Sequence, residues 1–550
     1  MRPPHARPLG RGAVPGLVFA LALVGSLSPA HAADEPVDLA MVQRIRDEGL
    51  QRSQVMDLVT HLTDAIGPRL TGSPQMKAAN DWTRAKFEEW GLTNARLESW
   101  TFGPGWSLQH AFVRQVSPEP AVLVAWPRAW SPATQGAVRG PAVYAPVEAE
   151  SDLAKWKGKL AGRIVLMSKP AEIKWLDQPL FTRRSDAELA EYATTEVGGR
   201  PPERMTRFRQ RRRLGATVHR FLAEERPLAA IFVSPGEGGV VTVGGTGLRG
   251  KDDPREVPQL TLLGEQYNRL VRQLERGLPV ELELEVRATF HDDDPLAYNT
   301  LAEIPGSGPK RDEVVMLGAH LDSWHAGTGA TDNATGSAVV MEAMRILSAI
   351  GAKPRRTIRA ALWSGEEQGL LGSRAYVSRH FASRPEATDD DPQRGPVKPL
   401  PDHARLAAYF NIDGGTGRVR AVLAQENVAV LPIFDAWIRP LKDLGVVLAS
   451  PRRDFGSDHN TFDGAGLPGF NFLQDQIEYE TLTHHTQLDV LDRVRREDVV
   501  QAAVVMAAFA WQAAQRDEML PRKPMPPPNP PREDGAPAGG PAAPAPVPSR

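Results

Sequence analysis

The sequence predicts an α/β fold: a mainly parallel mixed sheet with helices on both faces, into which a second, β-rich domain is inserted. From Asn299 onward, continuous apolar runs alternate with helical segments, and such runs are typical of strands buried on both faces of a parallel sheet. The runs occupy residues 314–319, 358–363, 407–412 and 469–473. From residue 120 to 290, short β-like runs alternate with glycine and proline turns, which indicates a separate β-rich domain.

The first 32 residues have the composition of a secretory signal peptide. Three arginines precede a short apolar run at 14–27, and Ala30-His31-Ala32 offers a small-x-small cleavage site. The run is too short to span a bilayer comfortably, so we expect cleavage rather than the alternative, an N-terminal anchor. The expected product is a secreted or periplasmic protein with no integral membrane segment.

Residues 36–95, ahead of the β-rich segment, have the apolar spacing of helices. Gly67-Pro68 ends the first helical run, and Gly91 ends the second. A chain of 550 residues is long enough for two domains and tails. We expect a signal peptide at 1–32, the N-terminal part of a catalytic domain at 33–119, an inserted domain at 120–290, the main catalytic part at 291–520 and a disordered Pro/Ala-rich tail at 521–550.

Charge and cysteine content exclude several classes of function. The formal net charge is -2, and loss of the three signal-peptide arginines makes it more negative, so nothing favours nucleic acid as a partner. The one basic run, residues 207–213, is interpreted as a solvated helix face, with an anionic partner as the alternative. The chain has no cysteine, which excludes disulfides, thiolate metal sites and cysteine nucleophiles.

Five acidic and histidine side chains are the candidate metal ligands. They are His320, Asp332, Glu367, Asp413 and His485. Most of them directly follow a predicted strand, and ligands of open α/β sheets bind beyond the carboxyl ends of the strands. Two imidazoles and three carboxylates are the ligand set expected of a zinc pair. The neighbouring Glu366 could then handle protons, which indicates a metallohydrolase with two metal ions.

Each of these residues also has an ordinary explanation when it is taken alone. Asp332 precedes a helix, where an aspartate is usually an N-cap, and Asp413 stands in a turn sequence. Within the full set, Asp332 is the best candidate to bridge two cations. Asp322 is expected to accept the second ring N–H of His320, and Asp489, four residues after His485, is a candidate to support the metal ligands without binding metal itself. The cluster at 457–459 is expected to shape the site.

Other hydrolase chemistries lack their sequence signatures. The chain contains no G-x-S-x-G nucleophile elbow, no H-E-x-x-H helix and no Walker loop. The glycine-rich segment G-T-G-A-T-D lacks the lysine of a phosphate-binding loop.

Several motifs together resemble the co-catalytic zinc exopeptidases of the bacterial leucyl-aminopeptidase superfamily, and within it the carboxypeptidase Q (plasma glutamate carboxypeptidase) branch. They are I-G-P-R-L-T-G-S, A-H-L-D-S, G-A-T-D-N-A-T-G, G-E-E-Q-G-L-L-G-S, N-I-D-G-G, S-D-H-N-T-F, L-Q-D-Q-I-E-Y-E and H-H-T-Q-L-D. The similarity extends over residues 38–515.

The resemblance implies a zinc exopeptidase fold with an inserted protease-associated-type domain and two Zn²⁺ per chain. His320 and Asp413 would complete one zinc site, and Glu367 and His485 the other. Asp332 would bridge the two ions and precede a cis peptide bond to Asn333. Glu366 would be the general base and acid.

The chain departs from this pattern where several relatives place a tyrosine that helps to stabilise the oxyanion. His484 and Phe455 stand at those positions, and we expect His484 to take part of that role. Trp324 and His325 are expected to line the substrate pocket. The pair Arg452-Arg453 could bind a terminal carboxylate, with a solvated loop as the alternative.

The predicted function is a secreted two-zinc metallo-exopeptidase that hydrolyses peptide bonds near the ends of peptides or dipeptides. Aminopeptidase or dipeptidase activity is preferred to strict carboxypeptidase activity. Two alternatives come from other classes: a catalytically inactive binding ectodomain, and an acyltransferase of the glutaminyl-cyclase type with one zinc. The sequence leaves open the side-chain specificity, the physiological substrate, the roles of the inserted domain and tail, and the oligomeric state, a homodimer included.

Overall fold

The computed structural model describes residues 35–194, 203–236, 238–247, 249–388 and 394–528. Contacts divide the chain into Met1–Glu35 and Pro36–Arg550, and the second unit holds every helix and strand described below. The predicted signal peptide at 1–32 lies outside the described residues. Within the described ranges, no helix has both the length and the apolar character needed to cross a membrane.

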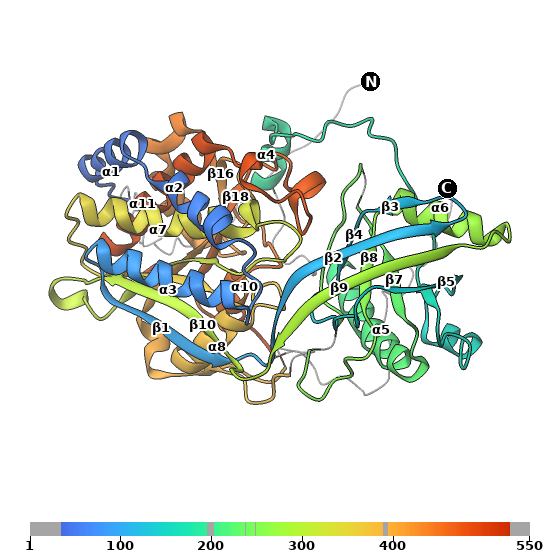
Figure 1. Ribbon diagram of the computed structural model, residues 1–550. Helices are drawn as coiled ribbons and strands as arrows, with labels where there is room; N and C mark the ends of the chain where they lie inside the picture. Colours follow the sequence, from blue (N-terminus) through green and yellow to red (C-terminus); the bar gives the residue numbers. More distant parts are fainter. Residues whose placement is uncertain (1–34, 195–202, 237, 248, 389–393, 529–550) are drawn as a thin grey trace, which may run out of the picture. The chain divides into compact units, whose positions relative to one another are not determined.

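An eight-stranded sheet in the order β1-β10-β12-β11-β15-β18-β16-β17 carries the candidate site (Figure 1). Its strands are β1 (Thr93–Thr101), β10 (Leu296–Ile304), β11 (Val314–His320), β12 (Thr357–Trp363), β15 (Leu406–Asn411), β16 (Val419–Leu423), β17 (Leu448–Ser450) and β18 (Gly469–Gln474). The four central strands, β12, β11, β15 and β18, run parallel, and β17 pairs parallel with β16. Strand β10 pairs antiparallel with β1 and β12, and β16 pairs antiparallel with β18. The mainly parallel mixed sheet is therefore confirmed.

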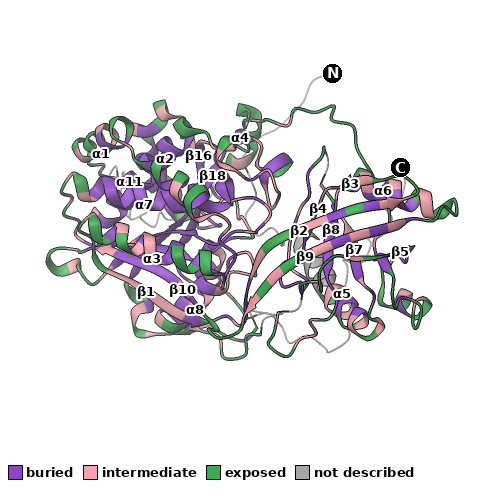
Figure 2. Cartoon of the chain, viewed as in Figure 1, coloured by how far each residue is buried: buried purple, intermediate pink, exposed green. Residues whose placement is uncertain are grey.

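Helices cover both faces of this sheet. They are α1 (Leu39–Gln51), α2 (Val55–Thr60), α3 (Pro74–Glu89), α7 (Thr335–Ala349), α8 (Leu371–His380), α9 (Leu431–Ile438), α10 (His459–Gly464) and α11 (Arg496–Gln515). Alternate side chains of a strand point to opposite faces. In β11, Val315 and Leu317 pack with α7 and α11, whereas Met316 packs with α8 and α10 on the other face. Helices α7 and α11 are buried over most of their length (Figure 2).

A second eight-stranded sheet has the order β3-β2-β9-β5-β6-β7-β8-β4. Its strands are β2 (Gly105–Ser117), β3 (Ala121–Leu123), β4 (Ala125–Pro127), β5 (Val138–Tyr144), β6 (Ile164–Leu166), β7 (Ala229–Val233), β8 (Gln259–Leu262) and β9 (Glu281–His291). Helices α5 (Glu203–Glu225) and α6 (Gly264–Glu275) pack on it. Strand β2 begins ahead of residue 120, and the division into domains stays a prediction.

Two other segments bear on the domain boundaries that the sequence predicts. Helix α4 (Asp186–Ala193) lies between β6 and α5 in the sequence, but its Leu189 packs on the main sheet. The first residues of the predicted tail are bound to the main unit, because Arg522 donates to the carbonyl of Leu406 and Lys523 pairs with Asp463. Residues 529–550 lie outside the described part of the chain.

Short elements complete the loops around the sheets. They are η1 (His61–Ile66), η2 (Glu150–Lys155), η3 (Gly308–Lys310), η4 (Ala330–Ala334), η5 (Pro401–Arg405), η6 (Val428–Val430), η7 (Arg439–Leu444), η8 (Tyr479–Thr483), η9 (Leu491–Arg493), β13 (Ala382–Ser383) and β14 (Lys398–Pro399). Two of these, η4 and η8, hold or adjoin candidate site residues.

Candidate metal centre

The structure brings all five predicted ligands together beyond the carboxyl ends of the central strands. His320 is the last residue of β11, Glu367 follows β12 and Asp413 follows β15. Asp332 lies in η4, just before α7, and His485 follows η8. Since parallel strands end at the same edge of a sheet, side chains far apart in the sequence meet there.

The Asp332 carboxylate lies between the two histidines. His320 Nε2 is 3.3 Å from Asp332 Oδ1 and 3.2 Å from Asp413 Oδ1. His485 Nε2 is 3.2 Å from Asp332 Oδ2 and 2.9 Å from Glu367 Oε2. Each oxygen of Asp332 therefore faces a different histidine, and each histidine also faces a second carboxylate. The peptide bond from Asp332 to Asn333 is cis, as the resemblance implied.

The donor set fits a pair of divalent cations. Ligand atoms of His320, Asp332 and Glu367 all lie within 4.8 Å of one another, as do those of His320, Glu366 and Asp413. Glu367 Oε1 is buried and accepts no hydrogen bond from the described residues. An isolated buried carboxylate oxygen is costly, and a bound cation removes that cost. Nitrogen and oxygen donors without thiolates suit zinc.

The pKa values of the site residues are shifted because several carboxylates lie close together and are buried. Burial raises the pKa of Glu367 to about 7. Burial, together with the charges of Asp413 and Asp458, holds the pKa of Glu366 well above its usual value. Burial alone would lower the pKa of His320, but the charges of Asp413 and Glu366, together with the carboxylates of Asp322 and Asp332, outweigh burial and raise that pKa. The site therefore attracts positive charge, whether protons or metal ions.

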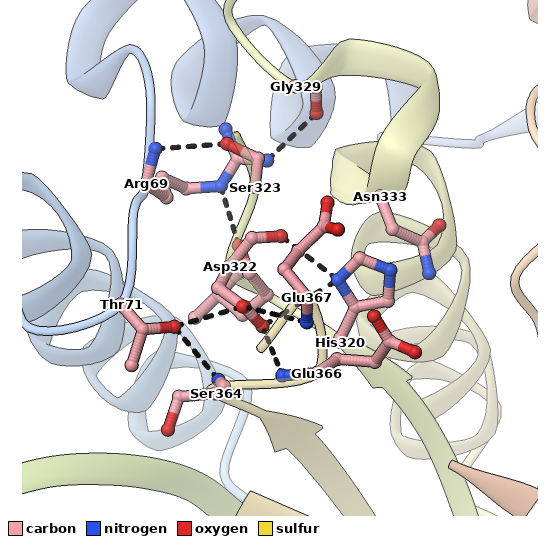
Figure 3. A network of polar contacts seen from close by, with 12 residues as sticks. Arg69, Thr71, His320, Asp322, Ser323, Gly329, Asn333, Ser364, Glu366 and Glu367 are labelled. Atoms are coloured by element: carbon pink, nitrogen blue, oxygen red, sulfur yellow. Dashed lines mark hydrogen bonds and ion pairs between the residues drawn. The ribbon is translucent and has the colours of Figure 1, made fainter. Parts of the chain in front are cut away.

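The Asp322 carboxylate does not hold the ring of His320 as predicted. His320 Nδ1 lies 2.9 Å from the backbone carbonyl oxygen of Asp322 and 3.6 Å from its Oδ1. The carboxylate instead accepts the N–H groups of Glu366 at 3.2 Å and Glu367 at 3.4 Å (Figure 3). The carbonyl still fixes the orientation of the ligand ring.

Asp489, the other candidate supporting residue, holds the backbone at Asp332. Its Oδ1 accepts the N–H of Thr331 at 2.6 Å and its Oδ2 accepts the N–H of Asp332 at 3.1 Å. Burial raises its pKa to about 7. Asp489 thus fixes the backbone that presents the central carboxylate.

His484 lies at the edge of the site. Its Nε2 is 3.9 Å from Asp332 Oδ2, and its ring centre is 3.9 Å from that of His485. The ring also packs on Tyr479, with 4.8 Å between centres. Sequence reasoning missed Tyr479, whose pKa is raised by burial and by the charges of Asp332 and Asp413. Its position in the motif I-E-Y-E, shortly before the histidine pair, was the available signal.

Trp324 and His325, the two residues expected to line the substrate pocket, lie in different surroundings. The ring of Trp324 packs edge-on against His485 at 6.1 Å, beside the candidate ligands. His325 is buried, its Nε2 lies 2.7 Å from the carbonyl oxygen of Pro127, and its ring packs on Trp106. The expectation for His325 is wrong, because the polypeptide turns its ring toward the second sheet.

Arg452 and Arg453 both have protein partners. Arg453 Nη2 lies 3.1 Å from Asp463 Oδ2, and the Arg452 guanidinium packs on the ring of Tyr192 at 4.2 Å. Arg453 is thus paired with a carboxylate, whereas the exposed Arg452 has a ring contact. In the neighbouring cluster, Asp458 is fully buried, and burial raises its pKa to about 7, so this residue contributes to the electrostatics of Glu366 rather than to the five-ligand set.

Comparisons with known proteins agree with the geometry. Residues 299–510 match the model of Peptidase family M28. Carboxypeptidase Q of Mus musculus is 29% identical over 273 residues, 50% of this chain and 53% of that protein. Carboxypeptidase Q of Rattus norvegicus is 25% identical over 462 residues, 84% of this chain and 85% of that protein. The chain thus spans about half the length of the mouse relative in that match.

Solved structures show the same fold. A peptidase M28 precursor from Shewanella amazonensis superposes with a TM-score of 0.65 and 27% identity, covering 89% of this chain and 99% of that chain. A zinc aminopeptidase from Bacillus subtilis gives 0.55 and 17% identity, covering 84% and 95%. The predicted resemblance to the co-catalytic zinc exopeptidases agrees with the family match over residues 299–510, and the predicted α/β fold is confirmed.

Proposed function

We propose that this chain, whose residues 299–510 match peptidase family M28, is a secreted metallo-exopeptidase that binds two Zn²⁺ ions. The observation that carries the proposal is the position of Asp332, whose two oxygens face His320 at 3.3 Å and His485 at 3.2 Å. His320 and Asp413 would hold one ion, and Glu367 and His485 the other, with Asp332 shared. When bound, the ions would polarise a peptide carbonyl and acidify a water molecule.

Glu366 is the residue that moves protons in this proposal. Its carboxylate is buried beside Glu367 and has a raised pKa. Bound cations would bring this pKa down toward neutrality, where a general base works best. Glu366 takes a proton from the attacking water and transfers it to the leaving amine. His484 stands at the edge of the site, where a ring N–H stabilises the oxyanion that forms.

The charges of the site favour recognition of a free N-terminal amine of the substrate over recognition of its C-terminal carboxylate. The candidate site is rich in carboxylates, which attract an ammonium group. Arg452 and Arg453 are engaged by Tyr192 and Asp463. We therefore prefer aminopeptidase or dipeptidase activity to strict carboxypeptidase activity. We propose peptides as the substrate class, because the similar proteins are named carboxypeptidases.

The test is amine release by the purified protein from matched peptides that are unblocked, N-acetylated or C-amidated, each with and without a chelator. Loss of a chelator-sensitive reaction on N-acetylation alone identifies an aminopeptidase. Loss on either block identifies a dipeptidase. Elemental analysis should find two zinc ions per chain, whereas one ion without peptide cleavage would contradict the proposal and support cyclase-type chemistry.

A further inference from the structure

The turn that follows β12 directs three consecutive backbone N–H groups toward one small region. The N–H of Gly365 donates to Thr71 Oγ1 at 2.9 Å. Those of Glu366 and Glu367 donate to Asp322 Oδ1 and Oδ2, at 3.2 Å and 3.4 Å. Successive N–H groups that converge in this way form a concavity suited to an anion. Here the Asp322 carboxylate and the Thr71 hydroxyl fill it together (Figure 3).

The hydroxyl oxygen of Thr71 links the Asp322 carboxylate to the turn that follows β12. Its hydroxyl donates to Asp322 Oδ2 at 2.9 Å while it accepts the N–H of Gly365. Both Thr71 and Asp322 are 0% exposed, so solvent does not take over these bonds when one partner is removed. The direction of the Asp322 carboxylate and the position of the turn therefore depend on the same hydroxyl.

The position of Thr71 is set by the loop after β11, which carries the candidate ligand His320. The neighbouring Arg69 guanidinium is buried and donates to the carbonyl oxygens of Leu321 at 2.7 Å and Gly329 at 2.8 Å. The Arg69 N–H donates to Ser323 Oγ at 3.0 Å. The segment around Arg69 and Thr71 is therefore held along the loop that runs from His320 toward Asp332.

We propose that Thr71 is a positioning residue: with Asp322, it holds the backbone of Gly365–Glu367 and so aims the Glu366 and Glu367 side chains at the metal centre. The inference rests on the proposed function, in which Glu366 is the general base and Glu367 a zinc ligand. Thr71 reaches neither side chain. It acts through the main chain, and small errors in the placement of reacting groups reduce turnover strongly.

The test compares three variants of the full chain. Thr71→Val removes the hydroxyl and keeps the shape, and Thr71→Ser restores a hydroxyl. Thr83→Val is the matched control, because Thr83 is also 0% exposed and its hydroxyl donates to the Ala79 carbonyl oxygen at 2.8 Å within α3. The readouts are kcat and KM on an unblocked peptide, the melting temperature, and the visible absorption spectrum of the Co²⁺-loaded protein, which reports ligand geometry.

We expect Thr71→Val to lower kcat by roughly tenfold to a hundredfold with little change in KM, and to alter the Co²⁺ spectrum. Thr71→Ser should restore most of both, and Thr83→Val should keep the parent kcat and spectrum even where its melting temperature falls. Any of three results would overturn the positioning role. They are a parent-like kcat in Thr71→Val, an equal loss of kcat in Thr83→Val, and failure of Thr71→Ser to recover kcat.

The two proposals fail in different ways. A parent protein that cleaves no peptide contradicts the proposed function, and the Co²⁺ spectra then decide the positioning role alone. A spectrum changed in Thr71→Val but not in Thr83→Val supports it, and spectra identical in all variants overturn it.

Discussion

Asp489 accepts the backbone N–H of Asp332 at 3.1 Å, so one buried carboxylate fixes the main chain that presents another. Its second oxygen accepts the N–H of Thr331 at 2.6 Å. Both bonds need an acceptor at each oxygen of Asp489. An amide at this position keeps one acceptor and turns a donor toward a backbone N–H, which removes one bond and adds a repulsive contact.

Asp489→Asn should therefore weaken zinc binding by roughly tenfold to a hundredfold, the effect expected when support of a ligand is lost. Competition titration with a chromophoric chelator measures this directly. Asp492→Asn is the control, since Asp492 lies in the nearby η9 and is exposed. Equal zinc affinities for the parent and Asp489→Asn would show that the backbone of η4 holds Asp332 without help from Asp489.

Glu366→Gln should fold and bind zinc as the parent does but lose about 10²-fold to 10⁴-fold in kcat, because an amide does not accept the proton of the attacking water. The measurement is kcat on an unblocked peptide together with zinc content and melting temperature. Glu497→Gln, at an exposed position in the first turn of α11, is the control. Full turnover by zinc-loaded Glu366→Gln would exclude Glu366 as the base.

His325 makes the stability of the protein depend on pH. Burial lowers its pKa to about 4, whereas the unfolded chain binds a proton near pH 6.5. The unfolded state thus binds more protons between these values. The contribution of His325 to the free energy of unfolding is therefore complete above about pH 6.5. It is lost as the pH falls toward about 4, and the total loss is about 3 kcal/mol.

His325→Gln should flatten this part of the stability curve, because glutamine does not titrate and its amide can still donate toward the Pro127 carbonyl. Urea unfolding between about pH 4 and pH 7 measures the slope for both proteins. The same variant of His291, at the partly exposed end of β9, is the control. A slope unchanged by His325→Gln would mean that other groups cause the acid sensitivity.

The sequence was sufficient to predict where the candidate site lies, but not how its residues are supported. His320 and Asp413 could be found because each follows a strand whose apolar run is visible in the sequence. Asp322 was assigned to the ring of His320, and the partner of Asp489 could not be named, because the choice between a ring N–H and a backbone N–H depends on loop conformation.

Long-range contacts were harder still to predict. Thr71 meets Asp322 because the segment between η1 and α3 is bonded through Arg69 to the loop after β11, a contact that no local pattern contains. Tyr479 reaches the site because the single π-helical turn of η8 brings its ring against His484. Both depend on tertiary packing, which periodicity does not report.

His484 and Tyr479 offer two possible donors to the oxyanion, and turnover distinguishes them. His484→Ala should lower kcat by roughly tenfold to a thousandfold with a smaller change in KM, as expected for a donor that acts mainly in the transition state. Tyr479→Phe keeps the ring that packs on His484 and removes only the hydroxyl, so it is the matched comparison. If His484→Ala keeps normal turnover while Tyr479→Phe loses it, the donor is Tyr479. In that case His484 serves only to hold the tyrosine ring and the Asp332 carboxylate, which lies 3.9 Å from its Nε2.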